Sequence, residues 1–441
     1  MIDLILRNVL TVLPDGAHHA DIAIDGGEIV GFERAPARQE IDGRGLLAMP
    51  GAIDTHVHFN EPGRAEWEGF ASGSAALVAG GGTCCFDMPL NSSPPVLDPA
   101  SFDLKRIAAE QSSVADFGLW GGITPGNLDQ LEALAERGVV GFKAFMSDSG
   151  ISDFERSDDD TLHRGMSIVA SLGLPVAVHA EDQSLTARRT AEARAAGRSS
   201  VRDYLDSRPI DAEVIAINRA AEIARATRCD LHIVQVSSAP GVQAVLAARA
   251  AGTQITCETC PHYLFLDDTD VIRLGAIAKC APPIRPRGEV DALWREMLSD
   301  HINLVASDHS PAPASMKQSS DFFDVWGGIA GVQCTLSLLL SDDRLTPQTI
   351  ASLTATRPAD RYGISGKGRL AIGYDADIVL VDPEASWTLQ RDDLYDRHRA
   401  SPYAGRAFRG RVMATFVRGR RVFDGTHVDS AHRGRLVRPN R

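Results

Sequence analysis

Eight short apolar runs recur through the middle of the chain, and most are separated by Ala-rich stretches that carry Arg and Glu. In stretches such as 212–228 and 242–251 the apolar residues recur at helical spacing. Strands that are buried on both faces read as unbroken apolar runs. The pattern predicts eight strand and helix pairs, with strands over 47–57, 83–88, 116–123, 139–145, 176–180, 231–236, 254–259 and 302–307.

Eight such pairs predict an α/β protein built on a closed (β/α)₈ barrel, with an open doubly wound sheet as the alternative. A dinucleotide-binding open sheet would have Gly-x-Gly-x-x-Gly after its first strand, and this chain has no such motif there. Residues capable of chemistry instead follow six of the eight strands. The carboxyl ends of barrel strands meet at one mouth, so a barrel would gather those residues into one site.

The two ends of the chain follow a different pattern. Short apolar runs broken by turn signals occupy the first fifty residues and recur from 377 to 423, which is typical of antiparallel β-structure. Because the termini of a domain usually lie close together, we expect both ends to form one small β-sandwich domain. The expected parts are 1–50 and 365–441 for this domain and 51–364 for the TIM barrel.

Composition narrows the possible partners. The 441 residues include 45 Lys and Arg against 58 Asp and Glu, a net charge of −13, which argues against binding nucleic acid or an anionic membrane. No basic leader and no apolar stretch of about 18 residues is present. The 7 cysteines are an odd number without a disulfide pattern. We expect a soluble cytoplasmic protein with a small-molecule substrate.

Histidines and an aspartate mark the ends of three predicted strands. His56 and His58 end the first strand, and residues two apart in a strand point to the same side. His179 ends the fifth strand and Asp308 ends the eighth. His-x-His at a strand end is a moderately specific metal signal, and the other two residues strengthen it. The sequence therefore predicts a metal site at the barrel mouth.

Lys143 lies inside the apolar fourth strand. Most strand lysines extend a flexible stem to solvent, which is the simpler interpretation. An ammonium facing bound cations in the barrel interior would be strongly disfavoured. A neutral amine can add carbon dioxide to become a carbamate, an anion whose two oxygens can bridge two divalent metals. Lys143 is thus either a carbamylated ligand of a binuclear site or a surface residue.

Several motifs in chain order resemble those of the cyclic amidohydrolases, the group of dihydroorotases, hydantoinases and allantoinases, and the match is closest to the allantoinases. The resemblance spans nearly the whole chain and implies the family's TIM barrel with a β-sandwich domain. The segments that carry it are 50–64 (PGAIDTHVHFNEPGR), 87–91 (DMPLN), 141–143 (GFK), 178–181 (VHAE), 257–263 (CETCPHY), 279–285 (KCAPPIR), 307–311 (SDHSP) and 368–379 (GRLAIGYDADIV).

The resemblance implies two divalent metal ions of the zinc type. It assigns His56, His58 and Asp308 to one ion and His179 to the second. It also implies that Lys143 is carbamylated by carbon dioxide and bridges the two ions. One position departs from the family. A second-metal histidine is expected directly before Val-Ser-Ser, and this chain has Gln235 there.

Three interpretations of Gln235 are open: a weaker second site, an enzyme that works with one metal, or a non-catalytic paralogue. An amide oxygen is a less common zinc ligand than imidazole nitrogen. His232 is no ready substitute, because it lies three residues earlier and faces the other way along the strand. We favour retained metal-dependent hydrolysis, since the other ligands and the interior lysine are all kept.

The loop after the first strand bears on the substrate. Dihydroorotases typically present an Arg two residues after the second histidine, and this chain has Asn60. A neutral amide suits a ring without a carboxylate. Asn60, Asn91 and the Ala281 backbone are the candidate substrate-binding groups, although Asn91 is nearly as well explained as a turn residue.

The resemblance implies hydrolysis of the hydantoin ring of allantoin to allantoate, with Asp308 as the catalytic proton acceptor. The alternatives are a hydantoinase or dihydropyrimidinase, a dihydroorotase, and a non-catalytic subunit. The resemblance also implies a homotetramer.

Overall fold

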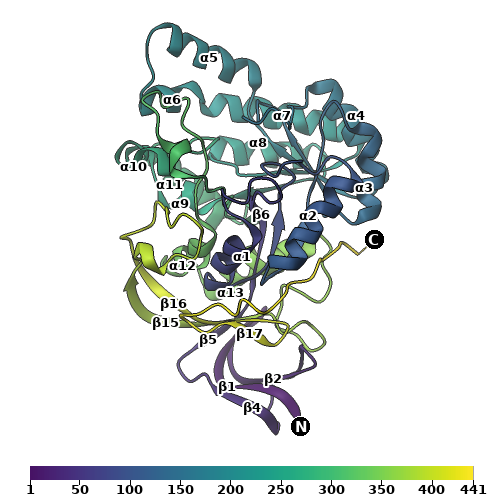
Figure 1. Ribbon diagram of the computed structural model, residues 1–441, viewed down its shortest axis with the longest axis vertical. Coiled ribbons are helices and arrows are strands. Elements are labelled where there is room, and N and C mark those ends of the chain that lie inside the picture. Colours follow the sequence, from purple (N-terminus) through teal and green to yellow (C-terminus); the bar gives the residue numbers. More distant parts are fainter. Residues whose placement is uncertain (441) are drawn as a thin grey trace.

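The computed structural model describes residues 1–440. Strands from both ends of the chain gather at one end of the molecule, and a helix-covered barrel fills the rest (Figure 1). The predicted TIM barrel with a β-sandwich domain is confirmed.

The barrel consists of parallel strands in chain order. Two sheets are continuous around it, β6-β7-β8 and β9-β10-β11-β12-β13-β14. A parallel bridge between Val57 and His309 closes the ring, and the His58 N–H donates to the His309 carbonyl at 2.8 Å. The strands are β6 (Ala52–Val57), β7 (Gly82–Asp87), β8 (Asp116–Leu119), β9 (Gly121–Gly122), β10 (Phe142–Phe145), β11 (Pro175–His179), β12 (Asp230–Ile233), β13 (Ile255–Thr259) and β14 (Leu304–Val305).

One predicted strand is wrong. The apolar run 47–57 is two strands, because β5 (Leu47–Pro50) belongs to the terminal sheet and β6 to the barrel. Gly51 separates them, and a Cβ there would lie 2.1 Å from the Thr83 Cγ2 atom. Both strands are buried and apolar, so hydrophobicity alone does not show that the chain changes sheets.

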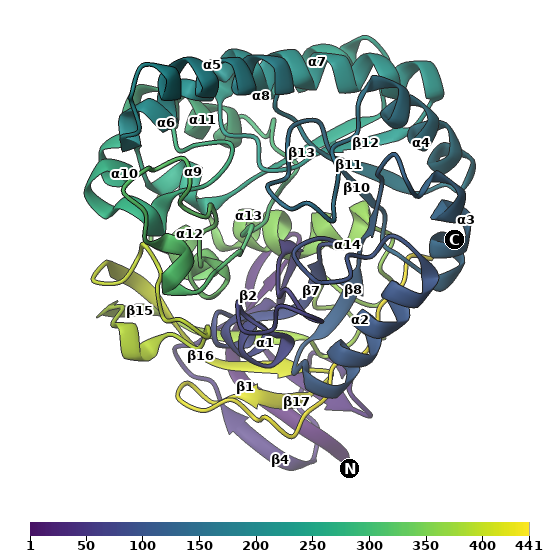
Figure 2. The ribbon, with the colours of Figure 1, turned by 45° about the horizontal axis from the view of Figure 1, so that its top comes forward.

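Helices follow most barrel strands and surround the barrel in the tilted view of Figure 2. Helix α4 (Asp159–Ser171) begins at an acidic run, residues 158–160, which the helix dipole favours, and the Asp158 carboxylate accepts from the Thr161 N–H at 2.9 Å. The helices are α1 (Phe70–Ala79), α2 (Pro99–Ser112), α3 (Leu131–Arg137), α4 (Asp159–Ser171), α5 (Gln183–Ala195), α6 (Val201–Ser207), α7 (Ile210–Thr227), α8 (Ala239–Ala250), α9 (Pro261–Phe265), α10 (Asp268–Leu274), α11 (Arg287–Leu298), α12 (Thr335–Leu340), α13 (Pro347–Ala351) and α14 (Arg357–Arg361).

The terminal sheet joins the two ends of the chain. Its order is β17-β16-β15-β5-β1-β2-β3, with β4 paired to β1, and the antiparallel β5–β15 pair connects the N-terminal and C-terminal strands. The boundaries at residues 50 and 364 stay a prediction. The strands are β1 (Ile2–Leu13), β2 (Gly16–Asp25), β3 (Glu28–Gly31), β4 (Ala37–Asp42), β5, β15 (Ile378–Thr388), β16 (Ala407–Val417) and β17 (Arg420–Phe423).

Buried ion pairs join this sheet to the base of the barrel. The Lys367 Nζ atom lies 2.7 to 2.8 Å from carboxylate oxygens of Asp116, Asp375 and Asp377. Asp116 begins barrel strand β8, whereas Asp377 directly precedes β15. Beyond β17 the chain returns to the barrel, where Leu436 forms a parallel bridge with Phe117. The contacts fix one end of the barrel and leave the opposite mouth for the site.

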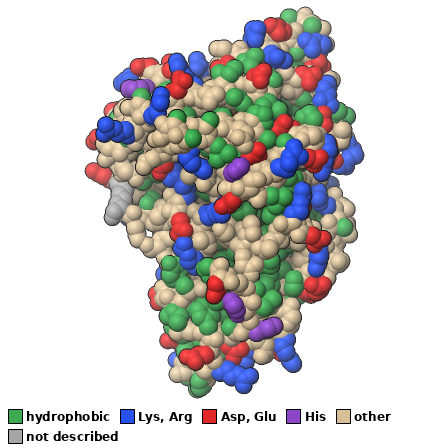
Figure 3. All heavy atoms as spheres, turned by 180° about the vertical axis from the view of Figure 1, so that it is seen from behind, with side chains coloured by type: hydrophobic (Ala, Val, Ile, Leu, Met, Phe, Trp, Pro, Cys, Tyr) green, Lys and Arg blue, Asp and Glu red, His purple; other side chains and the backbone are tan. Residues whose placement is uncertain are grey.

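The surface mixes both signs of charge. On the face shown in Figure 3, acidic and basic side chains of the described residues alternate without an extended basic patch. Within residues 1–440 no helix is both long and apolar enough to span a membrane.

Candidate active site at the barrel mouth

Three of the predicted metal ligands meet at the carboxyl ends of β6 and β14. The Nε2 atoms of His56 and His58 lie 3.1 and 3.4 Å from Oδ1 of Asp308. All three residues offer donor atoms within 4.8 Å of one another. Burial opposes ionisation of Asp308, but His56 and then His58 lower its pKa well below the ordinary value. Two imidazoles and a carboxylate form a typical open site for a divalent cation.

Glu258 on β13 orients this site, and the sequence prediction missed it. Its Oε1 lies 2.6 Å from Nδ1 of His56, and its Oε2 lies 3.1 Å from Nε2 of His232. Burial alone would raise the pKa of Glu258, but the two histidines lower it to about 2. The carboxylate holds the Nδ1 proton of His56 and leaves Nε2 free for a cation. His232 therefore supports Glu258 from behind and is not a metal ligand.

Lys143 is enclosed in the barrel. Its side chain is 0% exposed, and its Nζ has no hydrogen-bond partner among the described residues. The nearest aromatic face is that of Phe145, with its centroid 5.1 Å from Nζ. Burial lowers the pKa of Lys143 to about 8, although Asp308 opposes the shift. An interior amine of lowered pKa and without a partner fits the chemistry of carbamylation.

His179 and Gln235 form the other side of the site. The His179 Nε2 lies 2.9 Å from Oε2 of Glu181, which also accepts from Arg208. The Gln235 Nε2 lies 3.1 Å from Nδ1 of His179 and 2.8 Å from the Ala281 carbonyl oxygen. Glu181 and Arg208 were not predicted, although Glu181 lies in the quoted segment 178–181 two residues after His179.

Four non-glycine residues after barrel strands have left-handed backbone conformations. The φ angles are 64° at Asn60, 64° at Asn91, 47° at Gln235 and 47° at Asp308. Asn adopts this region fairly readily, whereas for other residues it costs on the order of 1 kcal/mol. Such outliers cluster at functional sites, where the surroundings hold them in place. The backbone thus marks the same mouth as the side chains do.

A cavity of about 690 Å³ opens above these groups. His58, His179, Gln235 and Asp308 line it, together with the predicted substrate residues Asn91 and Ala281. The Asn91 Nδ2 lies 3.4 Å from Nδ1 of His58. Asn60 is 0% exposed and does not line the cavity, and neither of its amide atoms has a partner among the described residues. Its role in substrate binding stays a prediction.

Two lysines fix the loop that walls this cavity. The Nζ of Lys279 donates to three carbonyls, at 2.7 Å to Phe322, at 3.1 Å to Phe323, and also to Val325. The Nζ of Lys317 donates to the carbonyls of Ala276, Trp326 and Gly328 at 2.8 to 3.2 Å. An ammonium has three donors, so each is fully matched. Segment 323–328 is thereby held against the segment that contains Ala281.

Replacing Lys279 by Met is expected to loosen this wall. Three carbonyls would lose their donor, and each buried unpaired carbonyl costs about 1 to 3 kcal/mol. We expect a lower free energy of unfolding, a higher KM and faster proteolytic cleavage within 319–328. Arg188→Met on the exposed face of α5 is the control and should change none of these. An unchanged KM and an unchanged cleavage rate for Lys279→Met would contradict the assignment.

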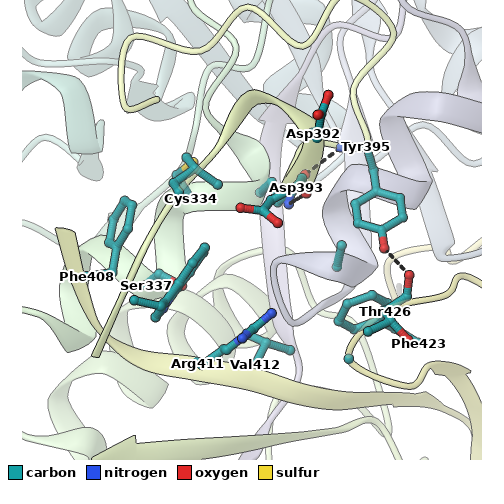
Figure 4. A pocket seen from close by; sticks show the side chains of 15 residues that line it. Cys334, Ser337, Asp392, Asp393, Tyr395, Phe408, Arg411, Val412, Phe423 and Thr426 are labelled. Atoms are coloured by element: carbon teal, nitrogen blue, oxygen red, sulfur yellow. Dashed lines mark hydrogen bonds between the residues drawn. The ribbon is translucent and has the colours of Figure 1, made fainter. Parts of the chain in front are cut away.

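Two other features do not compete with this site. Asp116, Asp375 and Asp377 lie close enough to hold a cation, but Lys367 already supplies the positive charge among them. A hollow of about 200 Å³ lies beside the terminal sheet, where the Tyr395 hydroxyl donates to the Thr426 carbonyl (Figure 4). None of the described residues that line the hollow is a histidine.

The chain is similar to known proteins over its whole length. An allantoinase of Solibacter usitatus is 53% identical over 100% of this chain and 97% of its own length. An allantoinase of Rubrobacter xylanophilus is also 53% identical, over 100% of this chain and 98% of its own length. The match extends to both ends, so it includes the terminal sheet as well as the barrel.

Solved structures show the same architecture at lower identity. The L-hydantoinase (dihydropyrimidinase) from Arthrobacter aurescens superposes with a TM-score of 0.96 at 29% identity, covering 99% of this chain and 100% of the other. A D-hydantoinase superposes with a TM-score of 0.92 at 28% identity, covering 100% and 99%. The amidohydrolase family model matches residues 47–422. On these matches, and with its histidines and Asp308 gathered at the barrel mouth, the chain belongs to the amidohydrolase family.

Proposed function

We propose that this protein hydrolyses the hydantoin ring of allantoin to give allantoate. The full-length allantoinase relatives at 53% identity support the substrate, and the barrel-mouth site supports the chemistry. The main structural support for this substrate is that the cationic side chains lining the cavity are already bound to other groups of the protein. Arg208 is paired with Glu181, Arg194 lies 2.5 Å from Asp324, and Lys279 is bound to carbonyls. Each described cation in the wall already has a partner.

This arrangement favours a neutral ring over a carboxylate-bearing one. Each guanidinium in the wall is already ion-paired with a carboxylate, and the family position for an Arg that clasps a substrate carboxylate holds Asn60. The amide groups of Asn60 and Asn91 and the backbone of Ala281 match the many amide donors and acceptors of allantoin. Asn91 and Ala281 line the cavity and are our proposed direct contacts, whereas Asn60 would act from behind the cavity wall.

Family membership implies a divalent metal site, and the donor set fits one. We assign a zinc-type ion to His56, His58 and Asp308, with Lys143 as a carbamate beside it and His179 on the far side. A divalent cation supplies positive charge that lowers the pKa of a water and polarises the ring carbonyl. The unpartnered Nζ of Lys143 supports the carbamate, since the added group would bring it interactions that the free amine lacks.

Asp308 performs the proton transfer in this proposal. Its carboxylate accepts a proton from the water as the water oxygen bonds to the ring carbonyl carbon. The ring C–N bond then breaks, and Asp308 returns the proton to the leaving nitrogen, so one water is consumed per ring opened. The neighbouring histidines lower the pKa of Asp308, which keeps the carboxylate ionised at neutral pH.

Turnover of a small panel of rings tests the proposal. The metal-loaded protein should open allantoin with a kcat/KM at least about 100-fold above that for dihydroorotate, because a buried carboxylate without a partner is costly. Unsubstituted hydantoin and dihydrouracil separate the hydantoinase alternative, which the structural match to L-hydantoinase supports. Preferential opening of dihydroorotate would show that the neutral-ring assignment is wrong.

We further propose a cytoplasmic homotetramer. All seven cysteines are free and buried, which suits a reducing compartment. The tetramer rests on the family resemblance, and light scattering of the purified protein measures it directly.

A further inference from the structure

The hydrogen bonds around His179 define which of its nitrogens is available. Its Nε2 lies 2.9 Å from Glu181, a buried carboxylate that also binds Arg208. A carboxylate that lies between the Arg208 guanidinium and an imidazole acts as an acceptor toward both, so Glu181 accepts the ring proton at Nε2. The lone pair of His179 is on Nδ1, which faces Gln235.

Gln235 uses that lone pair. Its side-chain amide lies 2.8 Å from the Ala281 carbonyl oxygen and 3.1 Å from Nδ1 of His179. Both partners are acceptors, so the amide nitrogen and not the oxygen must face them. Each accepts one of the two amide protons. Gln235 is only 4% exposed, and its φ of 47° shows that the surroundings hold it in this place.

The opposite side of the site is arranged differently. The donor atoms of His56, His58 and Asp308 converge within 4.8 Å, and Glu258 already holds the far nitrogen of His56. Among the described residues no donor faces Nε2 of either histidine. Both Nε2 atoms instead face Oδ1 of Asp308, which is an acceptor. One half of the site is thus a set of converging ligands, and in the other half the Gln235 amide nitrogen already binds both His179 and the Ala281 carbonyl.

We propose that this protein binds one divalent cation per chain, at His56, His58 and Asp308, and that the Gln235 amide takes the place of a second one. A second cation would have to displace an amide proton from His179 and rotate the Gln235 amide, which leaves the Ala281 carbonyl unpaired. In return it would gain an amide oxygen, a weak ligand for a zinc-type ion. The amide also fixes the orientation of His179 and of the Ala281 backbone at the cavity wall. A second metal ion would fix His179 in the same way.

Metal content measures this directly. The protein is stripped with a chelator, reloaded with excess Co²⁺ and bicarbonate, desalted and analysed for cobalt per chain. We expect about one cobalt for the wild-type protein and about two for Gln235→His, because imidazole restores a nitrogen donor beside His179. Gln243→His on the exposed face of α8 is the matched control and should stay at about one. Two cobalts in the wild-type protein, or one in Gln235→His, would overturn the proposal.

A second variant removes the remaining donor. His179→Asn should still hold about one cobalt, since His179 is not a ligand of the single ion. Loss of that cobalt in a folded variant would overturn the proposal. Magnetic coupling between neighbouring cobalt ions, read by electron paramagnetic resonance, should be absent in the wild-type protein and present in Gln235→His.

The inference rests on the proposed function only in naming ring opening as the reaction for which the metal is used. Cobalt is counted without substrate, so a protein that fails to open allantoin can still hold one ion, and an active allantoinase that holds two would refute only the inference.

Discussion

Replacing Asp308 by Asn is expected to lower kcat for ring opening by at least about 10³-fold, a barrier increase of about 4 kcal/mol. The amide keeps the shape of the side chain but accepts no proton, and it removes the negative charge that faces His56 and His58 at 3.1 and 3.4 Å. Steady-state rates measured together with metal content separate the two effects. Retained metal with lost turnover identifies proton transfer as the main loss.

A matched substitution controls for charge alone. The Asp392 side chain is 97% exposed and lies far from the mouth, in the segment before β16. Asp392→Asn should leave kcat unchanged. If Asp308→Asn kept more than about a tenth of the wild-type kcat, another group would have to move the proton.

Replacing Lys143 by Ala is expected to lower kcat by a similar factor, at least about 10³-fold. With a pKa of about 8, about one Lys143 in ten is a neutral amine at pH 7 and can add carbon dioxide. The reaction joins the amine nitrogen to the carbon and releases a proton, which leaves an anion beside the cation. Alanine removes this anion and opens a cavity in its place.

Chemical rescue distinguishes the lost anion from lost packing. Propionate fits the cavity of Lys143→Ala and supplies a carboxylate, so we expect it to restore part of the activity and of the metal content. Lys143→Met fills the same space without charge and should not respond. Equal response of both variants, or wild-type activity in Lys143→Ala, would show that Lys143 supplies no anion beside the metal.

The scarcity of lysine is a signal that the sequence offered. The chain has only five lysines among its 45 basic residues, and arginine supplies the other cations. Lys105, Lys143, Lys279 and Lys367 are all buried. Lys317 is partly buried, with its ammonium bound to three carbonyls. Every lysine of this chain therefore makes an interior contact. The scarcity of lysine in the sequence is a signal from which an interior role of Lys279 could have been predicted.

Strand-end residues were found from sequence because a barrel imposes one rule on all of them. Parallel strands project their carboxyl ends to one mouth, so His56, His179 and Asp308 could be grouped from their positions after apolar runs. Strand hydrophobicity did not distinguish β5 from β6, since both are buried and only Gly51 lies between them.

The sequence by itself determined the barrel and the terminal sheet and predicted the candidate ligands, because burial on both faces and strand-end position leave a local pattern. Only the tertiary structure revealed the partners. Glu258 and His56 are 202 positions apart in the chain, and Gln235 donates to the Ala281 carbonyl 46 positions away. Which hydrogen bonds a side chain completes depends on neighbours distant in sequence, and for this reason the proposal of one metal rather than two draws on the fold.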